Sequence, residues 1–203
     1  MKIGIMGGTF DPIHNGHLML GEYAYRSCSL DEIWFMPNGN PPHKEHSAIE
    51  TNAKQRAEMV GLSIADKNYF KLNLYEVNRG QVSYSYETME YLHETYRDSE
   101  FYFIIGADSL FAIESWVKPE RIFPTCTILA AYRDDVDTRE EMEGQIQHLK
   151  DRYQAKIKLL ETPLLDVSSR ELRSMLRTGQ SIAAYVPEAV MCYIKRNGLY
   201  SAG

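Results

Sequence analysis

Apolar and polar positions follow two recurring patterns along the chain. Six short runs have the length and β-rich composition of buried strands: KIGIM (2–6), EIWFMP (32–37), YFKLNLYEV (69–77), FYFIIG (101–106), CTILAAY (126–132) and AKIKLLE (155–161). Between most of them lie stretches with helical spacing, such as residues 52–65 and 84–96. Strand and helix therefore alternate, which predicts an α/β fold: a Rossmann-like open, mainly parallel sheet with helices on both faces.

The length of the chain favours one domain. With 203 residues the chain can bury a large core, and it contains no internal repeat and no convincing linker. The polar segment 38–47 is rich in Gly and Pro, but a helical pattern follows at once, so we interpret it as a surface loop. We expect a single domain over 1–203, with the C-terminal helices, about 168–203, packed on the core.

Composition and charge narrow the classes of function. The chain is 44% hydrophobic and 25% charged, which is typical of a globular protein, and its net charge is −6. The acidic balance argues against a nucleic-acid partner bound by a broad basic surface. No apolar stretch approaches the ~20 residues of a membrane span. Cys28, Cys126 and Cys192 have neither disulfide nor zinc spacing, so we expect a cytoplasmic protein.

The segment GGTFDPIHNGH (7–17), directly behind the first predicted strand, carries the clearest candidate chemistry. Its glycines would let a phosphate approach the backbone, and Asn15 is a candidate N-cap of the following helix. His14 and His17 would then face the same side, with Gly16 keeping the surface between them low. The pattern is neither GxGxxG nor GxxxxGK[ST]. Two alternatives remain for His14 and His17. They could be metal ligands, although no third ligand follows at zinc spacing, or they could be packing residues.

Seven further segments extend this motif into a family resemblance: PNGNPPHK (37–44), RAEM (56–59), SYS with ET (83–88), FIIGADSL (103–110), Trp116, SSRELR (168–173) and VPEAVMCYI (186–194). In this order they resemble the bacterial nicotinate-nucleotide adenylyltransferases, members of the nucleotidyltransferase superfamily with the HxGH motif. The resemblance implies transfer of the adenylyl group of ATP to nicotinic acid mononucleotide, giving nicotinate adenine dinucleotide and pyrophosphate in NAD biosynthesis. It also implies that Mg²⁺ accompanies ATP, held mostly by phosphates and water.

The same resemblance assigns the ATP side of the site. It implies that His14, His17 and Arg173 are the catalytic residues, which neutralise charge on the phosphates. Ser168 or Ser169 can cap a helix, and Glu171 stands in capping-box register with Ser168. Arg170 replaces the Thr that is common in the family, and either a phosphate contact or solvent exposure is open for it. The implied ATP-binding set is Gly7, Gly8, Thr9, Phe10, His14, His17, Gly106, Asp108, Ser168, Ser169 and Arg173.

The acceptor side depends more heavily on the resemblance. For Asp108, ribose recognition competes with a helix-capping role, and for Asn38 ligand contact competes with a turn role. The resemblance implies that Trp116 stacks on the pyridine ring. A core position is the alternative, but the polar neighbourhood of Trp116 suggests less burial than that of Trp34. Arg133 could approach pyrophosphate or remain a surface charge. The implied acceptor-binding residues are Asn38, Lys44, Ser85, Trp116 and Val117. Among them, the resemblance implies that the backbone N–H groups of Ser85 and Val117 bind the nicotinate carboxylate. No residue is expected to bind a metal.

Three rival interpretations remain. An adenylyltransferase of the same fold could act on nicotinamide mononucleotide or phosphopantetheine instead. A tRNA-binding module related to the synthetases shares the HxGH motif, but the chain has no room for an anticodon domain. A non-catalytic nucleotide-binding protein is disfavoured by the intact His14, His17 and Arg173. We therefore expect small-molecule partners, ATP and nicotinic acid mononucleotide, with no nucleic acid and no membrane, and the oligomeric state, a homo-oligomer included, is open.

Overall fold

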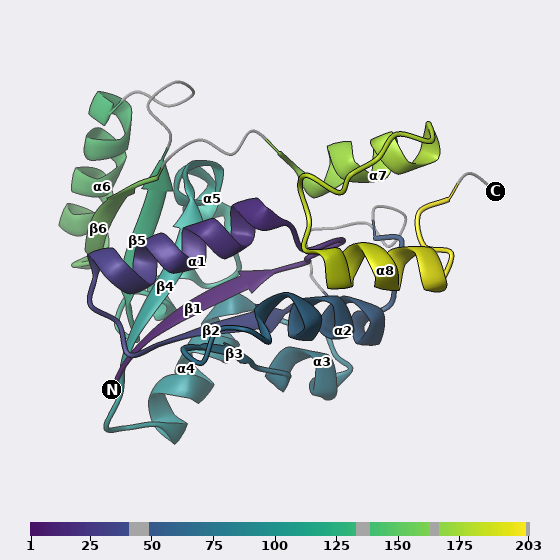
Figure 1. Cartoon of the computed structure of the whole chain (residues 1–203). Helices are drawn as coiled ribbons and strands as arrows, with labels where there is room; N and C mark the ends of the chain where they lie inside the picture. Colours follow the sequence, from purple (N-terminus) through teal and green to yellow (C-terminus); the bar gives the residue numbers. More distant parts are fainter. Residues whose placement is uncertain (41–48, 133–138, 163–166, 202–203) are drawn as a thin grey trace. The chain divides into compact units, whose positions relative to one another are not determined.

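A computed structural model describes residues 1–40, 49–132, 139–162 and 167–201 (Figure 1). Its strands are β1 (Lys2–Gly8), β2 (Glu32–Pro37), β3 (Phe70–Leu72), β4 (Glu100–Gly106), β5 (Thr127–Tyr132) and β6 (Lys156–Glu161). Its helices are α1 (Asn15–Ser27), α2 (Ala53–Ile64), α3 (Tyr75–Arg79), α4 (Ser85–Thr95), α5 (Ala107–Ala112), α6 (Arg139–Tyr153), α7 (Ser169–Arg177) and α8 (Glu188–Arg196), with 3-10 turns η2 (Ile113–Ser115) and η3 (Pro119–Arg121).

The strands form one sheet in the order β3-β2-β1-β4-β5-β6. β1 pairs with β4, β4 with β5 and β5 with β6, all in parallel. This confirms the predicted Rossmann-like open α/β sheet. In such an order the chain reverses direction across the sheet between β1 and β4, and ligands of this fold class bind beyond the carboxyl ends of the strands at that point. The segments after β1 and β4 are therefore the ones to inspect.

The chain divides into two compact units. The first comprises Met1–Gly7, Leu20–Trp34 and Ser83–Leu164, and the second comprises Gly8–Met19, Phe35–Val82 and Leu165–Gly203. We describe each unit separately, and the expectation of a single domain over 1–203 stays a prediction.

In the first unit, β4 is the central strand, and its interior positions Phe101 to Ile105 are all buried. A close approach of β1 to its neighbours explains Gly4: a Cβ there would lie 2.6 Å from Ile33 Cδ1. Helix α5 packs on β4 and β5, and α6 packs on β6 (Figure 1). The unit thus holds the carboxyl ends of β1 and β4 next to each other.

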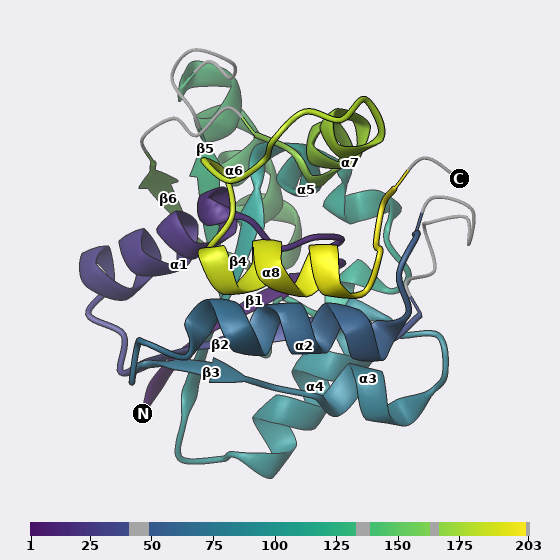
Figure 2. The same ribbon diagram turned by 45° about the vertical axis from the view of Figure 1, so that its right-hand side comes forward.

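In the second unit, α2 begins with a capping box. The Asn52 side chain accepts from the backbone N–H of Gln55, and the Gln55 side chain accepts from the N–H of Asn52. The buried face of α2 includes Ala57, Met59 and Val60. Helix α8 runs beside α2 and packs on it (Figures 1 and 2). The C-terminal segment is thereby fixed to the same unit as the histidine motif.

The structure differs from the predicted elements in two places. The run at 69–77 is a strand only over Phe70–Leu72, and Tyr75–Arg79 forms helix α3, which ends at Gly80 with a left-handed φ of 64°. Helix α6 has a charged sequence with three buried residues, Met142, Ile146 and Leu149, and its weak apolar pattern gave no prediction. Helix α8 follows its N-cap, Pro187.

Candidate active site

The segment after β1 turns sharply at Phe10, which has a left-handed φ of 54° although it is not a glycine. Its ring is buried beneath Gly8, where a Cβ would come within 2.9 Å of the ring. The same ring meets the His17 imidazole edge-on, with 5.0 Å between centroids. Of the residues predicted to bind ATP here, Phe10 can thus offer only its backbone, whereas Gly7 is exposed and Gly8 and Thr9 are partly exposed.

His14 and His17 lie together, as their spacing predicted. Their ring centroids are 3.7 Å apart with the planes inclined by 31°, and the His14 backbone N–H donates to His17 Nδ1 at 3.3 Å. In the neutral form of its ring, His17 therefore carries the proton on Nε2. Burial lowers the pKa of His14 to about 4, partly opposed by the Glu171 carboxylate. His14 is consequently neutral at physiological pH in the free protein.

Gly16 makes room for this pair. A Cβ at Gly16 would lie 3.0 Å from both Cε1 and Nδ1 of His14. The prediction that Asn15 caps the helix is wrong, because α1 begins at Asn15 itself. Its backbone N–H donates to Tyr185 O and its side-chain amide to Ala184 O, so Asn15 fastens the start of α1 to the segment before α8.

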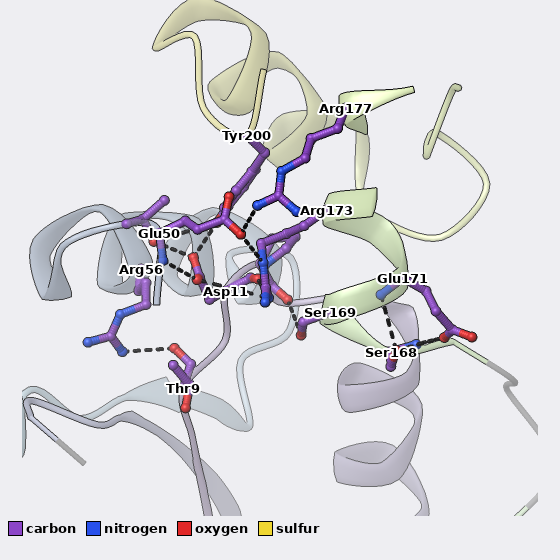
Figure 3. A network of polar contacts seen from close by, with 12 residues as sticks. Thr9, Asp11, Glu50, Arg56, Ser168, Ser169, Glu171, Arg173, Arg177 and Tyr200 are labelled. Atoms are coloured by element: carbon purple, nitrogen blue, oxygen red, sulfur yellow. Dashed lines mark hydrogen bonds and ion pairs between the residues drawn. The ribbon is translucent and has the colours of Figure 1, made fainter. Parts of the chain in front are cut away.

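Helix α7 begins with the predicted capping box. Ser168 is the N-cap: its hydroxyl accepts from the Glu171 N–H, while the Glu171 carboxylate accepts from the Ser168 N–H at 2.9 Å. Hydrogen bonds from the Ser168 hydroxyl and backbone lower the pKa of Glu171. The Ser169 hydroxyl donates to Pro12 O at 2.9 Å, which joins the start of α7 to the segment after β1 (Figure 3).

Arg173, one turn into α7, reaches the same segment. Its Nη1 donates to Asp11 O at 2.7 Å and its Nε to Glu50 Oε1 at 2.8 Å, while Arg177 also pairs with Glu50 (Figure 3). Arg173 and the histidine motif therefore lie in one cluster although 162 positions separate Arg173 from Asp11. The predicted contact of Arg173 with phosphates stays a prediction.

Asp11 is the centre of a buried hydrogen-bond network that the sequence analysis missed. Its carboxylate accepts from the Glu50 N–H at 2.8 Å, the Thr51 hydroxyl at 2.5 Å and the Tyr200 hydroxyl at 2.7 Å (Figure 3). Asp11 is 2% exposed, so these three donors replace water around its charge. The only signal in the sequence was an acidic residue inside the glycine-rich motif.

In the first unit, the segment after β4 carries Gly106 and Asp108. Gly106 is the N-cap of α5 and Asp108 is the second residue of that helix, so the capping alternative for Asp108 is wrong. Both residues are exposed at the carboxyl end of β4. This is the edge at which Rossmann-like sheets bind nucleotides, and ribose recognition by Asp108 stays a prediction.

The same unit brings the predicted nicotinate-binding segments together. Ser85 is the first residue of α4, so its backbone N–H is among those that have no acceptor within the helix. The segment after Trp116 packs on this helix start: Lys118 Nζ lies 5.2 Å from the Tyr86 ring centroid and Arg121 Cζ lies 4.6 Å from it. Val117 is 40% exposed. Trp116 packs edge-on against Phe103 and is half-buried, but so is Trp34, contrary to the expected difference.

Four other residues named in the sequence analysis have different outcomes. The backbone N–H of Asn38 donates to Gly8 O at 2.9 Å, which places the start of the 38–47 loop beside the segment after β1. Arg170 is exposed on α7. Lys44 and Arg133 lie outside the described residues.

The chemistry of this arrangement is that of anion binding. Imidazole N–H groups, the amino end of α7 and the Arg173 guanidinium are all donors, and such donors stabilise phosphate charge. Within the described ranges, no group of three or more His, Cys, Asp or Glu side chains could hold a metal ion. None of the helices described there is long and apolar enough to cross a membrane.

The comparison with protein families agrees with this class of site. The sequence model named "Cytidylyltransferase-like" matches residues 5–175, which include both the histidine motif and most of α7. Fold, donors and family model together define a nucleotidyltransferase.

Curated relatives make the family more specific. The probable nicotinate-nucleotide adenylyltransferase of Lachnoclostridium phytofermentans is 44% identical over 98% of this chain and 98% of its own length. That of Clostridium kluyveri is 40% identical over 98% and 99%. This chain belongs to the nicotinate-nucleotide adenylyltransferase family.

A solved structure shares the fold. The nicotinic acid mononucleotide adenylyltransferase of Plasmodium falciparum, complexed with NaAD, has a TM-score of 0.79 and 23% identity, covering 98% of this chain and 97% of that one.

Proposed function

We propose that this protein transfers the adenylyl group of ATP to nicotinic acid mononucleotide, producing nicotinate adenine dinucleotide and pyrophosphate. The observation that carries the proposal is full-length similarity to enzymes of that name, in a chain whose histidine motif and α7 share one donor cluster. We further propose that the reaction takes place in the cytoplasm, in keeping with the free thiols of Cys28, Cys126 and Cys192.

The reaction would be an in-line displacement at phosphorus. A phosphate oxygen of the mononucleotide attacks the α-phosphorus of ATP, and the bond from that phosphorus to the bridging oxygen breaks, so that pyrophosphate leaves with the electron pair. The nucleophile is already anionic, so no strong general base is needed. Alignment of two anionic substrates can supply ~7 to 11 kcal/mol of the barrier, and the rest must come from stabilisation of charge.

His14, His17 and Arg173 would provide that stabilisation. Two imidazolium rings stacked at 3.7 Å would repel each other, so at most one histidine is charged while the phosphates are bound. A neutral His17 with its proton on Nε2 can donate a hydrogen bond to the α-phosphate. If the negative charge of the phosphates draws an additional proton to the pair, His14 would bind it. Arg173 would move from Glu50 to the β- and γ-phosphates.

Nicotinate recognition is proposed for the start of α4 and the segment after Trp116. The N–H of Ser85 at the amino end of α4 and the N–H of Val117 are two donors for one carboxylate. A carboxamide would turn its NH₂ toward one of these donors, which leaves that donor without a partner. This difference would make the enzyme prefer the acid to the amide. The Trp116 ring would stack on the pyridine ring, and the Asp108 carboxylate would accept hydrogen bonds from ribose hydroxyls.

Mg²⁺ fits this site as a companion of ATP. The carboxylates of the donor cluster already have partners: Asp11 accepts three hydrogen bonds and Glu50 pairs with two arginines. An ion held mainly by phosphate oxygens and water needs few protein ligands, and when bound it would neutralise part of the triphosphate charge.

The test is an acceptor panel. The purified protein with ATP and Mg²⁺ should release pyrophosphate much faster with nicotinic acid mononucleotide than with nicotinamide mononucleotide or phosphopantetheine. His17→Ala should lower kcat by about 100-fold or more while changing both KM values little, since the group acts chiefly in the transition state. Preference for the amide would overturn the acceptor, and an unchanged kcat in His17→Ala would remove His17 from the chemistry.

A further inference from the structure

Among the residues that the structure describes, Arg56, on α2, is the largest side chain that is almost completely buried, with 1% of its surface exposed. Removing a guanidinium from water is unfavourable unless its donors are satisfied, and an apolar residue of similar volume usually stabilises such a position at least as well. The presence of a charge there therefore calls for a reason other than packing.

The contacts of Arg56 join two segments that are far apart in sequence. Nη1 donates to Thr9 O at 2.8 Å, while Nη2 donates to Asn38 O at 2.7 Å and to Gly39 O at 3.1 Å (Figure 3 shows the bond to Thr9). All three acceptors are backbone carbonyls, so Nη1 and Nη2 of the guanidinium bind the main chain of both segments. In the described part of the structure, Nε is buried without a hydrogen-bond partner.

The charge of Arg56 is supported only from a distance. The carboxylates of Asp11 and Glu76 raise its pKa, but burial is the larger effect and lowers it. Among the residues that the structure describes, no carboxylate accepts a hydrogen bond from Arg56, so the guanidinium serves there as a planar fork of donors rather than as half of an ion pair.

We propose that Arg56 is a positioning residue that holds the segment Gly8–His17 and the segment Asn38–Asn40 at a fixed separation, so that ATP and the acceptor phosphate are aligned for attack. The inference rests on the proposed function, in which the first segment binds ATP and the second begins the acceptor loop. A backbone hydrogen bond from Asn38 to Gly8 O already joins the two segments. Arg56 adds three bonds from a side chain that is itself held by α2.

A positioning role makes a specific kinetic claim. Each substrate alone needs only its own segment, whereas the chemical step needs both in register, and a displacement of about 1 Å in such an alignment can lower the rate about 100-fold. Loss of Arg56 should therefore lower kcat far more than it weakens binding of either substrate by itself.

The experiment compares Arg56→Lys and Arg56→Met with wild type. Lys keeps the charge but not the fork, and Met keeps much of the volume without any donor. For each variant, kcat per folded molecule is measured with both substrates saturating, and Kd is measured separately for ATP and for the mononucleotide. Arg26→Met, which removes an exposed arginine paired with Glu22 on α1, is the matched control.

We expect kcat to fall about 30- to 100-fold in both Arg56 variants, each Kd to change less than threefold, and Arg26→Met to match wild type. A kcat within threefold of wild type in either folded variant overturns the proposal. An increase in the Kd of either substrate as large as the decrease in kcat also overturns it. Failure of both variants to fold also overturns it, because Arg56 would then serve the fold itself. An inactive wild type would instead count against the proposed function.

Discussion

At the scale of single residues, the two imidazoles with ring centroids 3.7 Å apart decide how charge enters the site. His14 is 6% exposed, and Nδ1 of its ring is buried without a hydrogen-bond partner among the described residues. Such a ring resists protonation until an anion lies beside it. In the free protein the His14 ring is therefore neutral. The negative charge of a bound triphosphate would favour protonation of this ring.

The pKa of His14 predicts a dependence of stability on pH. The group binds its proton with a pKa of about 4 in the folded protein and 6.5 in the unfolded chain. Between these values the unfolded chain binds more protons, so the free energy of unfolding should fall as pH falls from 6.5 to 4, by about 3 kcal/mol in full. Urea unfolding across this range should show a flatter dependence for His14→Gln than for wild type. An equal slope in both would contradict it, and the exposed His93→Gln is the control.

Gly16→Ala tests the space beside His14. Its Cβ would press on two atoms of the imidazole at 3.0 Å, so we expect kcat to fall about tenfold while the melting temperature changes by only a few degrees. Gly144→Ala, in α6, is the matched control, because nothing lies within 4 Å of its Cβ. That control should keep kcat and gain up to about 1 kcal/mol of stability from helix propensity. Equal kcat values for the two variants would show that the imidazole has room to move.

Residue types predicted part of this cluster and missed the rest. The spacing of His14 and His17 was enough to predict that they lie together, since residues three positions apart lie on the same side of a helix. The network around Asp11 could not be predicted, because its donors Thr51 and Tyr200 are ordinary residues in sequence and gain their role only from burial. The partners of Arg173 in the protein, Glu50 and Asp11 O, also lay outside what the sequence could predict, and its contact with phosphates stays a prediction.

At the scale of elements, α7 is the helix that carries donors to the histidine motif. Removing its N-cap with Ser168→Ala should lower stability by about 1 kcal/mol, or ~2 to 4 °C in melting temperature, because the Glu171 N–H loses its acceptor. We also expect a higher KM for ATP, since Ser169 and Arg173 lie in the loosened turns. Ser174→Ala, at an exposed position inside the same helix, should leave the KM for ATP unchanged and should not lower stability. Parallel behaviour of the two variants would argue against the cap.

Elements with a strong apolar pattern were predictable and those without one were not. The 32–37 run matches β2, and the 52–65 pattern matches α2 with its Asn52 cap. Helix α6 was not predicted because its buried positions, Met142, Ile146 and Leu149, lie among charged residues in the sequence. The run at 69–77 misled because tyrosine and valine favour strands, while Tyr75 begins a short helix in the tertiary structure.

At the scale of the whole molecule, the resemblance over nearly the full length predicted the family, but the long-range bonds needed coordinates. Tyr200 illustrates this, because burial beside the Asp11 carboxylate raises the pKa of its phenol and keeps it a donor. Tyr200→Phe should cost about 2 kcal/mol of stability and lower kcat, since a buried charge loses one donor next to the motif. Tyr193→Phe, whose hydroxyl donates to Glu58 at an exposed site, is the matched control. Identical losses would indicate a generic effect of removing a hydroxyl.

The bond between Asp11 and Tyr200 also has a consequence during synthesis, because the two residues are 189 positions apart. At ~5 to 20 residues per second, a ribosome that has just made Asp11 needs roughly 10 to 40 s more to make the tyrosine that completes its set of donors. Until then the carboxylate must remain hydrated, and the turn that presents the histidines stays unfinished. The nascent chain should therefore acquire its competence only after Tyr200 has been made.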